Sequence, residues 1–133
     1  MKYLSIIFSL FFGISNIYCH KASNFSLTNK NLYENYTGSY QFSSDGITLT
    51  LTLQQDSEHN LTGNLVSTNQ SQFKLEGMVS QGIASGVCYN NEISLFFEAY
   101  LDGTSLTLSL IEPDAYNMPD YNTAKHIPFE KVN

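Results

Sequence analysis

Residues 47–53 alternate strictly between a large aliphatic side chain and threonine, in the order Ile-Thr-Leu-Thr-Leu-Thr-Leu. Successive side chains of a β-strand point to opposite faces of a sheet, so this segment places its isoleucine and three leucines on one face and its threonines on the other. A helix would distribute the same apolar residues around its circumference. The segment therefore predicts a strand with one face on a hydrophobic core and the other toward water.

The same alternation recurs from residue 38 to the end of the chain, separated by turn-forming pairs such as Asp45-Gly46 and Asp102-Gly103. Most connections are short, which makes strands that are consecutive in sequence neighbours in space. Closing such a meander removes its exposed edges. We therefore predict an all-β domain over residues 38–133, a single antiparallel up-and-down β-barrel of about eight strands, with a two-sheet sandwich as the alternative. The expected strands are residues 38–42, 47–53, 61–66, 73–79, 83–88, 92–101, 105–111 and 126–132.

The inward positions of these strands are rich in leucine and phenylalanine. An eight-stranded barrel can be filled by side chains or can hold one small ligand, and so many large side chains favour a filled interior. Gly63, Gly77 and Gly86 fall on or near the inward face, where a missing side chain permits the bending that closure needs. The expected core is Tyr40, Phe42, Ile47, Leu49, Leu51, Leu53, Leu61, Leu65, Phe73, Leu75, Val79, Ile93, Leu95, Phe97, Leu106, Leu108, Leu110, Ile127 and Phe129.

The first 19 residues have the organisation of a signal peptide. Lys2 supplies a positive start, and residues 4–14 form an apolar run that is too short to span a bilayer. Cleavage after Cys19 is expected, with cleavage after Ser15 as the competitor and a retained anchor as the alternative to removal. We therefore expect a secreted or periplasmic protein without a stable membrane anchor after cleavage. Residues 20–37 are polar, lack a period, and are expected to form a flexible arm.

Cleavage after Cys19 leaves Cys88 as a single thiol in an oxidising compartment. A lone cysteine on a strand is most often a small buried apolar residue, and we expect this of Cys88. Earlier cleavage would instead permit a disulfide between the two cysteines, linking the arm to the barrel wall.

The charge of the chain restricts its partners. Arginine is absent, and removal of Lys2 leaves five lysines against twelve carboxylates, a net charge of −7. Such a surface cannot neutralise phosphates or read guanine with a bidentate contact. We therefore expect no nucleic-acid partner, and a protein or a small neutral or apolar ligand is the expected partner.

Residues 112–125 form the most prominent candidate binding segment. This connection is long for a meander, and Pro113 and Pro119 stiffen it. Long structured loops on rigid scaffolds often bind other molecules. The alternative is an Ω-like cap that closes one end of the barrel with its tyrosines packed inward. The candidate partner-binding residues here are Glu112, Asp114, Tyr116, Asp120 and Tyr121.

A second candidate surface lies on the outer face of the strand expected at residues 92–101. Phe96 and Tyr100 flank Glu98 there, because the alternate positions of this strand point inward. Exposed aromatic side chains mark interaction sites, so Phe96 and Tyr100 are candidate partner-binding residues. The alternative is that residues 112–125, or the N-terminal arm, cover this face.

No motif for catalysis, metal binding or cofactor binding stands out in the sequence. The three histidines are scattered, and the spacing of Glu112, Asp114 and Asp120 matches no calcium-binding loop. We therefore expect no cofactor and no metal, and an exported, non-enzymatic binding or interaction module. The alternatives are a carrier of a small apolar ligand inside the barrel, an inhibitor of a secreted hydrolase, and a hydrolase that uses two carboxylates among Glu98, Glu112, Asp114 and Asp120.

The segments Gly38-Ser-Tyr40, Leu61-Thr-Gly63 and Leu75-Glu-Gly77 resemble, in architecture only, the strands of small secreted meander barrels of the avidin-like and lipocalin-like kind. Residues 106–114 also resemble the late strand of uncharacterised exported bacterial β-domains. The resemblance implies an eight-stranded barrel. Tryptophan is absent, in contrast to the aromatic lining of avidin-like ligand sites, so the resemblance assigns no ligand residue to this chain.

Overall fold

The computed structural model describes residues 34–132; the expected signal peptide and residues 20–33 of the expected arm lie outside this range. The described chain forms eight strands and no helix, which confirms the predicted all-β class. Accordingly, no helix among residues 34–132 is long and apolar enough to cross a membrane. The strands are β1 (Gly38–Ser44), β2 (Ile47–Gln55), β3 (Asn60–Ser67), β4 (Gln72–Ser80), β5 (Ile83–Tyr89), β6 (Ser94–Asp102), β7 (Ser105–Pro113) and β8 (Pro119–Val132).

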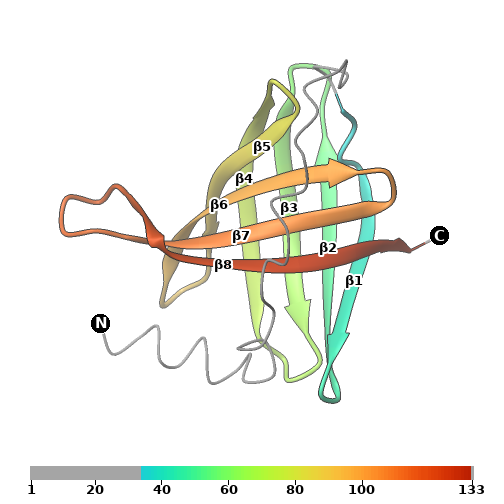
Figure 1. Cartoon of the computed structure of the whole chain (residues 1–133), viewed down its shortest axis with the longest axis horizontal. Helices are drawn as coiled ribbons and strands as arrows, with labels where there is room; N and C mark the ends of the chain where they lie inside the picture. The colour runs from blue at the N-terminus through green and yellow to red at the C-terminus, as the bar shows by residue number, and fades with distance from the viewer. Residues whose placement is uncertain (1–33, 133) are drawn as a thin grey trace.

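The strands form a closed barrel in which each strand pairs antiparallel with its neighbours in sequence (Figure 1). Closure comes from β1 and β8, where Tyr40 lies opposite Lys131 and two further pairs flank it. In Figure 1, β6, β7 and β8 cross in front of β1–β4 at a steep angle, with β5 passing between the two groups. The predicted up-and-down barrel is confirmed.

Two-residue turns set the register of several hairpins. Asp45 and Gly46 between β1 and β2 have φ angles of 51° and 78°, and Gln81 and Gly82 between β4 and β5 have 53° and 77°. Left-handed conformations at both turn residues match the twist of the adjoining strands. This is the turn that Asp45-Gly46 predicts, and it places Ser44 opposite Ile47.

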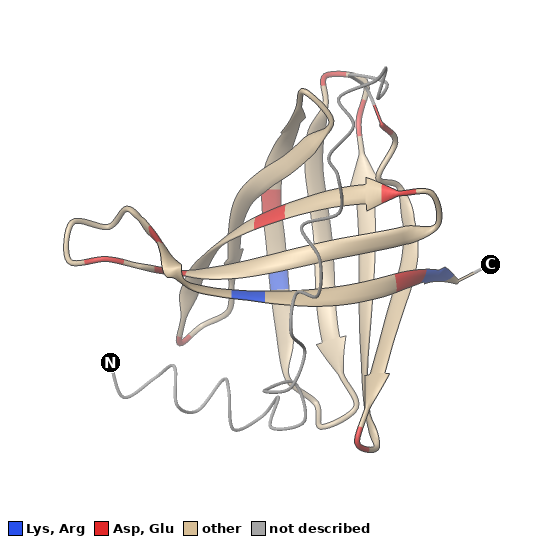
Figure 2. Cartoon of the chain, viewed as in Figure 1, with Lys and Arg blue, Asp and Glu red and all other residues tan. Residues whose placement is uncertain are grey.

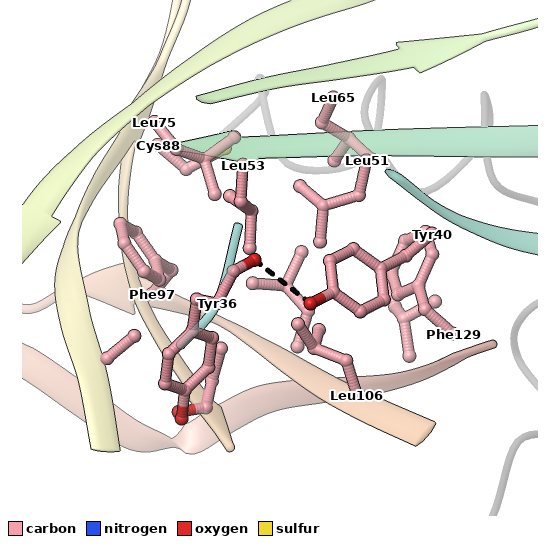
Figure 3. Close-up of a cluster of buried hydrophobic side chains, with 14 of the residues drawn as sticks. Tyr36, Tyr40, Leu51, Leu53, Leu65, Leu75, Cys88, Phe97, Leu106 and Phe129 are labelled. Atoms are coloured by element: carbon pink, nitrogen blue, oxygen red, sulfur yellow. Dashed lines mark hydrogen bonds between the residues drawn. The ribbon is translucent and has the colours of Figure 1, made fainter. Parts of the chain in front are cut away.

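The barrel interior is filled by side chains (Figure 3). Every predicted inward residue is either buried or packed against the buried cluster; only Phe42, Ile47 and Ile93 are partly buried. Tyr40, Leu51, Leu106 and Phe129 expose no surface, so no water-sized void borders them. Cys88 is free and buried in the same core, as expected for a small apolar residue.

Tyr36 was not expected in the core, because it lies in the segment predicted as a polar arm. Its side chain is completely buried, and its hydroxyl, which has one proton to donate, lies 2.8 Å from the carbonyl oxygen of Gly82 and 2.9 Å from that of Ala99. The Tyr40 hydroxyl donates in turn to the Tyr36 carbonyl (Figure 3). The chain therefore enters the barrel by placing an aromatic ring inside it, two residues before β1 begins.

The segment expected as a long loop at residues 112–125 is mostly strand. β7 continues to Pro113 and β8 begins at Pro119, so only residues 114–118 form the turn. The alternative of a cap with inward tyrosines is wrong, because Tyr116 is 88 % exposed and Tyr121 is 59 % exposed. Residues 112–120 instead form a hairpin that extends beyond the barrel, at the left of Figure 1, and we call it the projecting hairpin.

Candidate functional site

An open groove of about 550 Å³ lies on the outer face of the barrel, between β4 and the projecting hairpin. Its lining contains two neighbouring rows of residues that cross the strands. In the first row, which we call the polar row because all its members except Met78 are polar, Asn60 lies opposite Met78, Met78 opposite Ser85, and Ser85 opposite Glu98. In the apolar row, Val87 lies opposite Phe96, and Phe96 opposite Ile111. We call this site the outer groove.

The groove lies where β4 and β5 approach each other through two glycines. Gly77 and Gly86 are paired in register, and both line the groove although they occupy inward positions. A Cβ atom on Gly77 would lie 2.1 Å from the Ser85 carbonyl oxygen, and one on Gly86 would lie 2.1 Å from that of Glu76. Real Cβ atoms do not approach backbone so closely. The two glycines therefore permit a sharp bend, and the floor of the groove is backbone.

The apolar row has an unusual composition for the outside of a barrel. Val87 and Phe96 are half-buried, and Ile111 exposes 1 % of its surface although it points away from the core. Ile111 follows Leu110, so two large apolar residues in succession break the alternation of β7. That break is the sequence signal of a covered outer position, and it went unused in the prediction. Pro119 of the projecting hairpin and the adjoining Tyr121 also line the groove.

A bulge in β8 directs the projecting hairpin. Leu110 lies opposite Lys125 and Glu112 opposite Asp120, so residues 121–124 of β8 stand opposite Ile111 alone. Thr123 fixes this irregularity: its hydroxyl accepts from the Glu112 amide (2.8 Å) and donates to the Asp120 carbonyl (2.6 Å). Extra residues in one strand bend it and increase its twist. The bulge therefore turns the hairpin away from the barrel wall and brings Tyr121 over β6.

Tyr121 and Glu98 join the hairpin to the barrel. The Tyr121 hydroxyl donates to Glu98 Oε1 at 2.6 Å, between residues 23 positions apart. This hydrogen bond to a carboxylate raises the pKa of the Tyr121 phenol above its ordinary value, because the neutral phenol is the donor. Glu98 is thereby held at the edge of the groove, and it is the carboxylate in the groove lining.

The turn of the projecting hairpin is closed by Asp114. Its Oδ1 accepts from the amides of Tyr116 (2.8 Å) and Met118 (2.9 Å), and its own amide donates to the Met118 carbonyl (2.7 Å). Asn117 takes the left-handed conformation, with φ 61°, that the turn requires. Tyr116 and Met118 remain 88 % and 60 % exposed at the tip.

The structure brings together some of the predicted binding residues and separates others. Phe96 and Tyr121 both line the groove, while Tyr100 lies farther along β6 and is half-buried outside it. Tyr116 is at the hairpin tip, and Asp114 serves the turn. Glu112 and Asp120 face each other across the base of the hairpin. The groove residues that the prediction missed include Met78, Ser85, Val87 and Ile111.

A serine and a histidine continue the polar row beyond the groove. Ser109 lies opposite both Glu98 and His126, and its hydroxyl is 2.7 Å from His126 Nδ1. Ser109 exposes only 6 % of its surface, which leaves its oxygen little access to a substrate. We interpret this pair as a structural contact that satisfies a buried hydroxyl.

Carboxylates dominate the charge of the described chain (Figure 2). Residues 34–132 contain all twelve carboxylates and three lysines, Lys74, Lys125 and Lys131. No group of three or more potential metal ligands gathers within this part of the chain. Glu112 lies opposite Asp120, and Glu98 adds a third carboxylate near the groove. The groove and the hairpin therefore lie in a region of negative charge.

The chain matches no known protein-family model, and no similar curated protein or solved structure was found.

Proposed function

We propose that this protein is an exported, non-enzymatic binding module that holds a segment of a partner protein in the outer groove and contacts the same partner with the projecting hairpin. The observation that carries the proposal is the apolar row in an open groove on the outside of a filled barrel, in which Val87 and Phe96 are half-buried and Ile111 is buried. Groups of exposed apolar side chains on a small protein are typical of interaction sites.

The exposed side chains around the groove support a protein partner. Tyr116, Met118 and Tyr121 of the hairpin region are 59–88 % exposed, and Met78 at the groove edge is 52 % exposed. Tyrosine is enriched among the residues that dominate binding energy, and methionine adapts its shape to a partner. The side chains of the described core leave little room for a small apolar ligand inside the barrel. The outer groove, by contrast, is open to a polypeptide.

The arrangement of the site before binding also supports the proposal. The bulge hydrogen bonds of Thr123, the turn hydrogen bonds of Asp114 and the Tyr121–Glu98 bond hold the hairpin in one orientation. A site ordered in advance loses less conformational entropy when it binds.

Site-specific photocrosslinking tests this function. A photoreactive phenylalanine analogue at Tyr116 or Met78 is expected to crosslink one partner in the culture of the producing organism, while the analogue at Thr50 on the outer face of β2 does not. The partner is then identified and purified. A Phe96→Ser chain is expected to bind it at least about tenfold more weakly than the wild type, as for a binding residue worth about 1.4 kcal/mol or more. Equal affinity of the two chains, with the barrel intact by circular dichroism, would contradict the proposal.

The projecting hairpin favours a second candidate function, inhibition of a secreted hydrolase. Four hydrogen bonds close its turn, and Tyr116 stands exposed at the tip, as an inhibitory loop requires. A panel of secreted proteases and glycosidases tests this alternative. Inhibition of one enzyme by the wild type that Tyr116→Ala abolishes and Phe96→Ser retains would favour the inhibitor over the groove-binding module.

A further inference from the structure

We propose that residues 20–33 of the chain's own N-terminal arm occupy the outer groove when no partner is bound, so that a partner must displace them. This inference rests on the proposed function and adds a regulatory element to the same site. It follows from where the described chain begins, from the length of the arm, and from the match between its side chains and the groove.

The described chain begins near one end of the groove. The Tyr36 amide donates to Gln55 Oε1 at 3.0 Å, and the Tyr36 ring is anchored inside the barrel. Gln55 lies opposite Leu61, whose neighbour Asn60 lines the groove. The residues that precede Tyr36 therefore start from a point beside the Asn60 end of the groove.

The arm is long enough to follow the groove. Between Asn60 on β3 and Ile111 on β7 there are four strand-to-strand steps, which correspond to about 19 Å. An extended chain advances about 3.3 Å per residue, so Leu27 and Phe25, seven and nine positions before Glu34, reach about 23 Å and 30 Å. Both can contact the apolar row, and the remaining residues extend toward the projecting hairpin.

The side chains of the arm complement the groove. Phe25 and Leu27 are two positions apart, so an extended arm turns both toward the same side, where the half-buried Val87 and Phe96 offer an apolar surface. Lys21 and Lys30 flank this pair. They are two of the five lysines that follow the expected signal peptide.

The described barrel has an excess of carboxylates, with Glu98 in the groove and Glu112 opposite Asp120 beside it. Because the arm is covalently attached, its effective concentration at the groove is in the millimolar range. A weak affinity of the arm for the groove is therefore enough to keep the groove occupied.

Paramagnetic relaxation in the secreted form, expected to begin at His20, tests the proposal. A nitroxide is attached to Ser26→Cys; the native Cys88 does not compete for the label, because burial raises the pKa of its thiol to about 12. We expect the amide signals of Val87, Phe96 and Ile111 to lose most of their intensity, while those of Gln41 and Thr50 on β1 and β2 keep theirs. Adding Phe25→Ser and Leu27→Ser should restore the groove signals, whereas the matched changes Asn24→Ser and Thr28→Ser should not.

Groove signals no weaker than those of Gln41 and Thr50 would overturn the proposal. So would attenuation that appears only between molecules, in a mixture of nitroxide-labelled chains without isotope and isotope-labelled chains without nitroxide. The proposed function is tested separately by the crosslinks at Tyr116 and Met78. Crosslinks without paramagnetic attenuation would leave that function standing and remove the arm from the groove. With both present, Phe25→Ser/Leu27→Ser should increase partner affinity, and an unchanged affinity would overturn the regulatory role.

Discussion

The hydroxyl of Tyr121 donates a 2.6 Å hydrogen bond to the carboxylate of Glu98, and so connects the bulge of β8 to the outer face of β6. Register pairing alone would not bring them together, because Glu98 pairs with Ser85 and Ser109, and Tyr121 lies in the irregular part of β8. The contact exists because four residues of β8 stand opposite one residue of β7. It completes the wall of the outer groove on the side of the projecting hairpin.

Removing this contact should loosen the hairpin without unfolding the barrel. Tyr121→Phe is expected to lower the free energy of unfolding by less than about 1 kcal/mol, because the hydrogen bond is exposed. Amide hydrogen exchange at residues 120–124 should become faster. Tyr116→Phe, which alters a tyrosine at the exposed tip, is the control and should change neither quantity. In Glu98→Gln, the pKa of Tyr121 should fall toward the ordinary tyrosine value, because the charged acceptor is lost; an unchanged titration would show that Glu98 does not hold the phenol.

The bulge should depend on the Thr123 hydroxyl. Thr123→Val keeps the shape of the side chain but removes the acceptor of the Glu112 amide and the donor to the Asp120 carbonyl. We expect a loss of about 1–3 kcal/mol in the free energy of unfolding, measured with denaturant, and faster exchange of the Glu112 amide. Thr107→Val on the same pair of strands is the control, because no side-chain hydrogen bond of Thr107 is found among the described residues. Equal stability of the two variants would argue against this role.

The Gly77–Gly86 pair should tolerate no side chain. Gly77→Ala or Gly86→Ala would place a Cβ atom 2.1 Å from a backbone oxygen of the partner strand, so we expect a loss of about 3 kcal/mol or more, or a failure to fold. Gly103→Ala is the matched control: its Cβ atom meets nothing within 4 Å, and only its φ of +63° opposes the substitution. That strain should cost about 1 kcal/mol. Thermal unfolding compares the variants, and a Gly77→Ala chain as stable as Gly103→Ala would contradict the close approach.

Burial of Tyr36 should make the fold sensitive to alkali. Burial first, and the nearby Glu34 second, raise the pKa of the Tyr36 phenol far above the ordinary value of 10.0. A proton held more tightly in the folded state stabilises the fold below pH 10, and this contribution is lost as the pH rises from there toward the folded pKa. The free energy of unfolding should fall by about 1.4 kcal/mol per pH unit in that range.

Tyr36→Phe separates this effect from the packing of the ring. At neutral pH it should be less stable than the wild type by about 1–3 kcal/mol, because the carbonyls of Gly82 and Ala99 lose their donor. Above pH 10 its stability should fall less steeply than that of the wild type. Parallel stability curves for the two chains in denaturant titrations at pH 8 and pH 11 would show that Tyr36 is not the group responsible.

The alternation of side chains predicted most of the fold, and only part of the site. Period two is a local property of each strand, and turn pairs such as Asp45-Gly46 set the pairing of neighbours, so the eight strands and their inward residues could be predicted. Phe96 and Tyr121 were recognised because aromatic residues at outward positions are unusual. The chain also contained an unused signal in Leu110-Ile111, where the alternation fails.

Sequence alone determined that the chain forms a series of antiparallel strands that bury alternate side chains, because that burial follows from the geometry of a single strand. Closure into a filled barrel depends on the pairing of β1 with β8. The tertiary structure decided where the outer groove lies and which residues line it. The outer groove depends on Gly77 meeting Gly86, on the row that joins Met78 to Glu98, and on four residues of β8 standing opposite Ile111. Each of these is a relation between strands, set by register and by one bulge, and a pattern within any one strand does not contain it. The burial of Tyr36 is likewise decided by carbonyls that lie 46 and 63 positions away in the chain.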